Sequence, residues 1–197
     1  MSFTFNGTEP EAIIFNGTEV ESVVINGVEV WTGKLLTLIK NGVVNTEVLT
    51  GLSYSEFDSD ESKYVTPTGN CSDKSYTKVV CDNPSYNGNV AGYVISKHLY
   101  TPSKFEVPID AKKLCIEGIA TEATTSRKTS TKFMVATHYN TYGYNESDVI
   151  TAGEFKVEID VENYQGQQVY LILIVHAISG TNNRYTVTYE TTNMYFE

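Results

Sequence analysis

Several features that define common protein classes are scarce in this chain of 197 residues. The longest uninterrupted apolar run, at 169–175, is far shorter than the roughly 20 residues that a membrane-spanning helix needs. The first four residues have neither the basic start nor the apolar stretch of a secretory signal peptide. We therefore expect a protein that is made in a cytoplasm and has no membrane partner.

Basic residues are also few, with 14 Lys and Arg against 24 Asp and Glu and a formal net charge of −10. No basic residue occurs before Lys34, whereas several glutamates do. Nucleic-acid binding requires clustered basic residues that neutralise phosphates, so we expect no nucleic-acid partner. An acidic surface of this kind mainly confers solubility.

The three cysteines are Cys71, Cys81 and Cys115, and an odd count argues against the disulfide framework of a small secreted protein. Cys71 and Cys81 are spaced so that a disulfide could join them across a hairpin, or both could remain thiols. Cys115 lies among apolar residues and is predicted to be buried in a strand. No spacing of Cys and His resembles a zinc site.

Recognisable catalytic motifs are absent from the sequence. There is no Gly-x-Ser-x-Gly, no His-Glu-x-x-His and no phosphate-cradling glycine loop, and the three histidines fall in different predicted strands. We therefore expect no enzyme and no cofactor. The acidic run with Asp58, Asp60 and Glu61 lacks the spacing and glycine of an EF-hand loop, so a solvated loop is favoured over a calcium site there.

The chain does contain a repeat at its amino-terminal end. Asn-Gly pairs occur at 6, 16 and 26, a strict period of ten residues. Asn-Gly favours the type I′ turn of a two-residue hairpin, because both central residues of that turn need positive φ. The repeat predicts an antiparallel meander of eight-residue strands, which we treat as a separate module at 1–33.

Both faces of this predicted meander are apolar, which a small isolated sheet in water cannot satisfy. We expect it to pack against copies of itself, the rest of the chain or another protein. The alternative is that it forms the outer strands of a single sandwich. The residues predicted to form an assembly interface are Ile14, Phe15, Val23, Ile25, Val28, Val30 and Trp31.

The remainder, 34–197, is predicted to be a β-sandwich. Its 14 tyrosines against one tryptophan, with abundant Thr and Val, suit strands better than helices. A further Asn-Gly hairpin is expected around Asn41-Gly42, and short strands at 63–66 and 76–81. Later strands are predicted at 91–99, 104–107, 113–120, 132–138, 154–161, 169–177 and 184–190. The segment 121–131, with Arg127 and Lys128, is predicted to be a solvated loop, and the alternative is a contact with an anionic sugar or phosphate.

The loop from His138 to Asn145 is the strongest candidate for ligand binding. Tyrosine rings stack on the apolar faces of sugars, and asparagine amides bind hydroxyls. The same residue types suit protein interfaces, so a sugar and a protein ligand both remain open, beside an ordinary connecting loop. The loop 179–184 is expected to lie beside it. The candidate ligand-binding residues are Tyr139, Asn140, Tyr142, Tyr144 and Asn145.

The amino-terminal units Phe-Asn-Gly-Thr-Glu-Val and Asn-Gly-Val-Glu-Val-Trp resemble the first segments of structural proteins from phages and prophages, including tail, baseplate and head-fibre components. This resemblance implies a virion protein, made in the host bacterial cytoplasm: a short head or tail fibre or a capsid decoration component. It implies capsid, portal or tail proteins as partners and a homo-oligomer. A trimer is favoured, because fibre-like virion proteins commonly trimerise.

Residues 90–190 resemble jelly-roll, carbohydrate-binding-module-like domains, in which an Ile-Asp-Val-x-x-Tyr-x-Gly corner leads into a central strand. Here that corner is 159–166. The resemblance implies a jelly-roll-type sandwich, a host-surface glycan as a ligand and, by family analogy, room for a structural Ca²⁺. The alternative function is a carbohydrate-binding or adhesion module of a bacterial surface protein.

Overall fold

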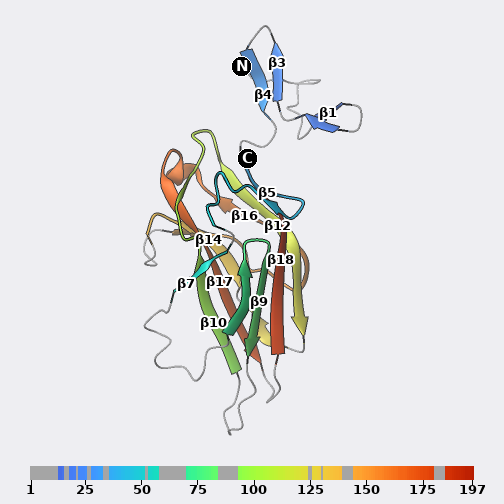
Figure 1. Cartoon of the computed structure of the whole chain (residues 1–197), viewed down its shortest axis with the longest axis vertical. Helices are drawn as coiled ribbons and strands as arrows, with labels where there is room; N and C mark the ends of the chain where they lie inside the picture. The colour runs from blue at the N-terminus through green and yellow to red at the C-terminus, as the bar shows by residue number, and fades with distance from the viewer. Residues whose placement is uncertain are drawn as a thin grey trace.

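The computed structural model shows an all-β chain with two antiparallel sheets arranged as a sandwich, which confirms the predicted fold class (Figure 1). The structure describes residues 13–15, 18–20, 22–25, 28–32, 36–51, 53–57, 70–83, 93–123, 126–129, 131–138, 144–179 and 185–197.

The first sheet of the sandwich has seven strands among the described residues, in the order β15-β14-β17-β10-β7, with β11 and β13 also paired to β17. Its central strand is β17, which hydrogen-bonds to β10 on one side and to β14 on the other. The bounds are β7 Ser55–Phe57, β10 Tyr93–Tyr100, β11 Phe105–Glu106, β13 Ser126–Thr129, β14 Lys132–Ala136, β15 Tyr144–Glu146 and β17 Gln168–Ser179.

The second sheet also has seven described strands, in the order β16-β12-β18-β5-β6, with the β8–β9 hairpin joined through β9 to β18. Its central pair, β12 and β18, has a register shift at Glu117/Gly118. The bounds are β5 Leu36–Lys40, β6 Val43–Val44, β8 Asn70–Ser75, β9 Lys78–Asn83, β12 Lys113–Ala123, β16 Gly153–Asp160 and β18 Tyr185–Phe196.

The chain crosses between the two sheets at most steps from β9 to β18. Among the described strands, β10–β11 and β13–β14–β15 are runs within the first sheet, and every other step from β9 to β18 crosses to the opposite sheet. The spatial orders β9-β18-β12-β16 and β10-β17-β14-β15 are those of a jelly roll, in which two Greek keys share two sheets. The described connectivity is therefore of the predicted jelly-roll type.

The core lies between the two sheets and follows the period of two that strands impose. In β17 the alternate residues Val169, Leu171, Leu173 and Val175 are at most 1% exposed and join the main core cluster. In β16, Val157 and Ile159 are buried and Glu158 between them is exposed. The corner that follows is the short 3-10 helix η2 (Glu162–Tyr164), and Gly166 has φ of 69°.

The strands on either side of two of the three Asn-Gly pairs form hairpins, as predicted. Phe15 pairs with Thr18, and Ile25 pairs with Val28, so two residues connect the strands in each case, and the first Asn-Gly pair lies outside the described residues. The four strands are β1 Ile13–Phe15, β2 Thr18–Val20, β3 Ser22–Ile25 and β4 Val28–Thr32. The meander takes the form of two successive two-stranded sheets, and neither is paired with a sandwich sheet among the described strands.

The register of the second hairpin has a consequence for the predicted interface. A shift between Val23 and Val24 places Trp31, and not Val30, opposite Val23. An uninterrupted ladder continued from the Ile25–Val28 pair would place Val30 opposite Val23 and Trp31 opposite Ser22. Gly7, Gly17 and Gly27 lie outside the described residues. The equivalent pair in the sandwich, Asn41 and Gly42, has φ of 50° and 75°, as a type I′ turn requires.

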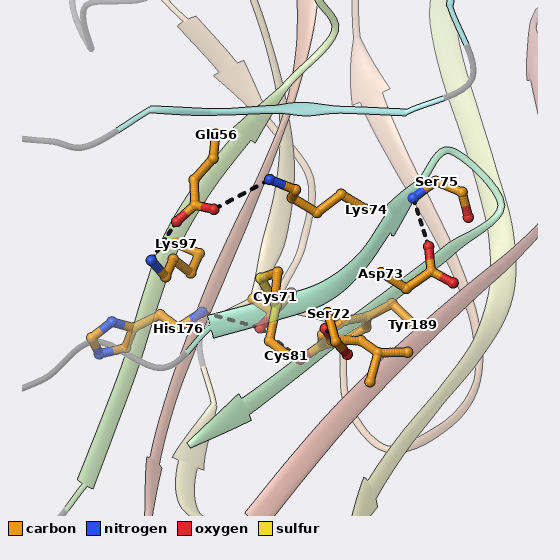
Figure 2. The surroundings of a disulfide bond; sticks show 12 residues. Glu56, Cys71, Ser72, Asp73, Lys74, Ser75, Cys81, Lys97, His176 and Tyr189 are labelled. Atoms are coloured by element: carbon orange, nitrogen blue, oxygen red, sulfur yellow. Dashed lines mark hydrogen bonds and ion pairs between the residues drawn. A yellow bond between two sulfur atoms is a disulfide. The ribbon is translucent and has the colours of Figure 1, made fainter. Parts of the chain in front are cut away.

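The β8–β9 hairpin carries a disulfide between Cys71 and Cys81, which stand directly opposite each other (Figure 2). Cys115 is free and buried, as predicted. Beside the disulfide, Glu56 of β7 accepts hydrogen bonds from Lys97 of β10 and Lys74 of β8. This three-residue ionic cluster joins one sheet to the other at an open edge of the sandwich.

Some predicted boundaries were wrong. Residues 126–129 form the strand β13 at the edge of β17, where a solvated loop was expected. β18 continues to Phe196, well past the predicted end, because Met194 and Phe196 are buried in the core. The strand predicted at 63–66 lies outside the described residues.

Candidate functional site

A second apolar cluster lies on the outer side of the first sheet, away from the main core. Met134, Ala136 and Ile172 are 2%, 2% and 6% exposed, and the partly buried Tyr100, Tyr170 and Ile174 pack against them. None of these six residues belongs to the main core cluster. A two-layer sandwich buries only the inner face of each sheet, so an apolar outer face is a site where a ligand or partner can pack.

The register of the strands shows how this face is laid out. Ala136 of β14 stands between Tyr144 of β15 and Tyr170 of β17. In the next row on the same side, Ile172 stands between Met134 and Tyr100 of β10. Three tyrosines from three strands therefore share the outer side of the sheet. We call Tyr100, Tyr144 and Tyr170, with the floor of Met134, Ala136 and Ile172, the tyrosine face.

The tyrosines differ in exposure and contact. Tyr144 is 38% exposed, whereas Tyr100 and Tyr170 are half-buried. The rings of Tyr100 and Tyr170 meet edge to face, with centroids 6.3 Å apart and an interplanar angle of 88°. This T-shaped arrangement fixes the direction of both rings on the sheet. Rings held in this way lose little conformational freedom when a ligand packs against them.

Two lysines bring charge to the tyrosine face. The ammonium of Lys104 lies 5.2 Å from the centroid of the Tyr170 ring, within the range of a cation–π contact. Lys132 forms an ion pair with Glu146 across the β14–β15 ladder. The charge of Lys132 is thereby balanced locally, whereas no carboxylate within the described residues pairs with Lys104.

Of the predicted ligand-binding residues, Tyr144 belongs to the tyrosine face. Asn145 is its neighbour in β15 and, by strand alternation, points to the opposite side. Its amide donates a hydrogen bond of 2.7 Å to the Asp160 carbonyl at the end of β16, so it ties two strands together. Tyr139, Asn140 and Tyr142 lie outside the described residues.

Ala136, the last residue of β14, pairs with Tyr170 near the start of β17, whereas Ser179 is the last residue of β17. The nine-position step from Tyr170 to Ser179 along an extended strand corresponds to about 30 Å. Residues 139–143 and 180–184 lie outside the described residues, so the expectation that the two loops lie side by side stays a prediction.

Sequence reasoning missed Tyr100, Tyr170 and Lys104 as site residues. A run such as 169–175, whose residues are all apolar or aromatic, is typical of a strand covered on both faces. In the structure Tyr170 and Ile174 are only half-buried on the outer side. The signal in the sequence was the run itself. Each strand of a two-layer sandwich has one face toward the core and one face outward, so a strand with two apolar faces presents one of them outward.

The outer side of the second sheet is a polar network of a different kind. Glu117 accepts hydrogen bonds of 3.0 Å from Tyr195 and 3.0 Å from Asn193, and Lys156 lies nearby. Burial raises the pKa of the Glu117 carboxyl, but these hydrogen bonds and the charge of Lys156 outweigh it and leave the pKa below its usual value. Hydrogen-bonded groups of this kind stabilise a sheet surface.

Cys115 lies beneath this network. Burial first, and then the nearby Glu197 and Glu158 carboxylates, raise the pKa of the thiol to about 12. The thiol is therefore protonated at neutral pH and unreactive as a nucleophile. Its position in β12 is that of a small apolar packing residue.

A groove of about 450 Å³ opens at the β5–β6 hairpin of the second sheet. It has neither an aromatic ring for stacking nor a carboxylate for acid–base chemistry, so the tyrosine face is the stronger candidate. Its lining residues are Thr37, Lys40, Asn41, Val43, Val44 and Asn45.

Within the described residues there is no group of three or more His, Cys, Asp or Glu side chains placed to hold a metal ion. The acidic run at 58–61 lies outside those residues. The described part of the chain also has no helix of the length and hydrophobicity needed to cross a membrane. Comparison with protein-family models and with curated proteins finds no match for this chain.

Proposed function

We propose that this protein is a non-enzymatic attachment protein of a phage virion, a short head or tail fibre or a capsid decoration component. Its amino-terminal hairpins join it to other virion proteins, and its jelly-roll sandwich binds a saccharide on the host surface through the tyrosine face. The observation that carries the proposal is the second apolar cluster with its three tyrosines on the outer side of one sheet.

The chemistry of the tyrosine face suits a sugar. The C–H faces of a pyranose ring pack on tyrosine rings, and the phenol hydroxyls at the edge can bond its hydroxyls. The face lies on paired strands, so its side chains are preorganised, and none of its six residues is a carboxylate of the kind that glycoside hydrolysis uses. These properties favour retention of a chain or terminal sugar over its chemical conversion.

The hairpin module supports the attachment role. Its strands pair only with each other among the described residues, so the sandwich sheets are complete without them. A two-stranded hairpin is marginally stable alone in water. A partner that adds surface to β1–β4 would stabilise them, and the resemblance to virion proteins suggests other virion proteins or copies of this chain as that partner.

Replacing Tyr144 and Tyr170 with Ala is expected to abolish binding to host cells or to immobilised cell-surface polysaccharide. The melting temperature should fall by only a few degrees, because Tyr144 is 38% exposed and Tyr170 lies outside the main core. Val43→Ala, which removes a 70% exposed apolar side chain from β6 of the second sheet, is the matched control and should bind normally. Unchanged binding by the double variant would refute the saccharide role.

Deleting residues 1–33 is expected to leave a folded, soluble domain that no longer joins virions or oligomers. The measurements are thermal unfolding of the 34–197 fragment, its sedimentation, and its incorporation beside the full chain. Failure of the fragment to fold would show that the hairpins belong to the sandwich. A full chain that sediments as a monomer would contradict the trimer.

A further inference from the structure

We infer that the saccharide bound at the tyrosine face carries a single carboxylate, as a terminal uronic or sialic-type acid sugar does. This inference rests on the proposed function and adds the charge of the ligand. It starts from Lys104, which lies next to β11 at the border of the face and is exposed. Its ammonium is held over the Tyr170 ring, 5.2 Å from the centroid.

The position of Lys104 follows from the pairing of β11 with β17. Phe105 is opposite Val169, which places Lys104 beside Tyr170 at the end of the row that holds Ala136 and Tyr144. Phe105 is buried in the main core and anchors this short strand. A sugar ring packed against the tyrosines would therefore have the Lys104 ammonium at one edge.

The charges around the face leave Lys104 as the group available for an anion. Lys132 is paired with Glu146, and the Glu106 carboxylate is oriented by a hydrogen bond of 3.2 Å from the uncharged Gln168 amide and forms no ion pair with Lys104 among the described residues. Among the described residues, Lys104 contacts the Tyr170 ring and pairs with no carboxylate, and an aromatic ring does not neutralise its charge. An ammonium beside a ring provides both stacking and a charge-assisted hydrogen bond to a carboxylate.

The net charge of the chain limits what this lysine can attract. With a net charge of −10, the protein as a whole repels a polyanion, whereas one lysine can compensate one carboxylate at short range. The combination favours a sugar with one acidic group over a chain of repeated acidic groups. We also expect the preference for the acidic sugar to weaken at high salt, because salt screens the exposed pair of the Lys104 ammonium and the sugar carboxylate.

The test compares matched sugars on the full-length protein. Immobilised oligosaccharides ending in glucuronic, galacturonic or N-acetylneuraminic acid are presented beside the same sugars with the carboxyl group reduced to a hydroxymethyl group. The wild type should prefer at least one acid form by about fivefold at low salt, the scale of one exposed ion pair, and less at high salt. Lys104→Gln should bind both forms equally, and Lys104→Arg should keep the preference.

The outcomes separate the two proposals. Equal binding of acid and reduced forms by the wild type, or an undiminished preference in Lys104→Gln, overturns the acid-sugar inference and leaves the saccharide role standing. Binding to none of the acid or reduced sugars overturns the inference, and an additional failure to bind host polysaccharide overturns the saccharide role. Tighter binding to a polyuronate chain than to the single terminal acid would overturn the single-carboxylate form.

Discussion

Among the Gly→Ala substitutions at the described glycines, Gly118→Ala is expected to destabilise the sandwich most. A Cβ at this position would lie 2.1 Å from the Glu190 carbonyl oxygen and 2.7 Å from Cζ of Phe155. The carbonyl belongs to the backbone of β18 and cannot swing aside, so the central β12–β18 pair must separate. We expect a loss of about 3 kcal/mol or more in the free energy of unfolding.

The reason for a glycine here is the irregularity in the neighbouring strand. Glu117 pairs with Asn193 and Gly118 with Thr191, so Thr192 is an extra residue in β18. Its carbonyl accepts a hydrogen bond of 2.8 Å from the amide of Gly42 in the β5–β6 turn. The close approach of β18 to β12 thus accompanies a bulge that links the turn to the sheet.

Thermal unfolding of Gly118→Ala beside Gly42→Ala provides the measurement and its control. Gly42 has φ of 75°, and no atom lies within 4 Å of the position that an alanine Cβ would take. Alanine there would strain the backbone but would not clash. We expect Gly42→Ala to cost about 1 kcal/mol. Gly118→Ala should lower the melting temperature by roughly 6–12 °C, given about 2–4 °C per kcal/mol for a chain of this size. Equal melting temperatures for the two variants would contradict the close approach.

The sequence contained the signals for the later strands and for the Asn-Gly turns. Alternation in 154–161 and the run at 169–175 identify β16 and β17, and Asn41-Gly42 identifies the β5–β6 hairpin, because both signals are local. The bulge at Thr192 was not predictable in this way. It depends on which strand lies beside β12, and the sequence of β18 alone does not specify its neighbour.

The candidate site likewise contains one residue that a local sequence signal identified and others that depend on strand pairing. Tyr144 was predicted from its loop composition, whereas Tyr100, Tyr170 and Lys104 are far apart in the chain and meet only through strand pairing. Asn145 looked like a ligand group by residue type, but its amide is used to hold the Asp160 carbonyl. Residue type indicates which chemistry is possible, and register decides which side chains share a face.

Glu56→Gln is expected to produce the second large loss of stability, because it leaves Lys97 without a carboxylate inside the sandwich edge (Figure 2). The side chain of Lys97 is only 9% exposed, so water cannot replace the lost partner. Breaking a buried pair from one side should cost about 2–4 kcal/mol. Lys74 is 35% exposed and can remain hydrated without Glu56.

Acid should reproduce part of this loss in the wild type. Burial alone would raise the pKa of the Glu56 carboxyl, but the hydrogen bond and charge of Lys97, followed by those of Lys74, outweigh it and lower the pKa. A carboxyl whose pKa is lower in the folded state stabilises the fold above its unfolded pKa of roughly 4.3. That stability is lost as the pH falls through the folded pKa, and Glu56→Gln should lack this component of acid sensitivity.

Two comparisons test whether burial is the cause. Glu190→Gln breaks the pair with Lys78, whose side chains are 48% and 46% exposed, and should cost less than about 1 kcal/mol. Glu56→Gln combined with Lys97→Met removes the stranded charge and should recover most of the loss, so that the double-mutant cycle yields a large coupling energy. If Glu56→Gln were no more destabilising than Glu190→Gln, the cluster would contribute as little as an ordinary surface ion pair. The joining of the two sheets at that edge would then depend on the β8–β9 hairpin and its disulfide.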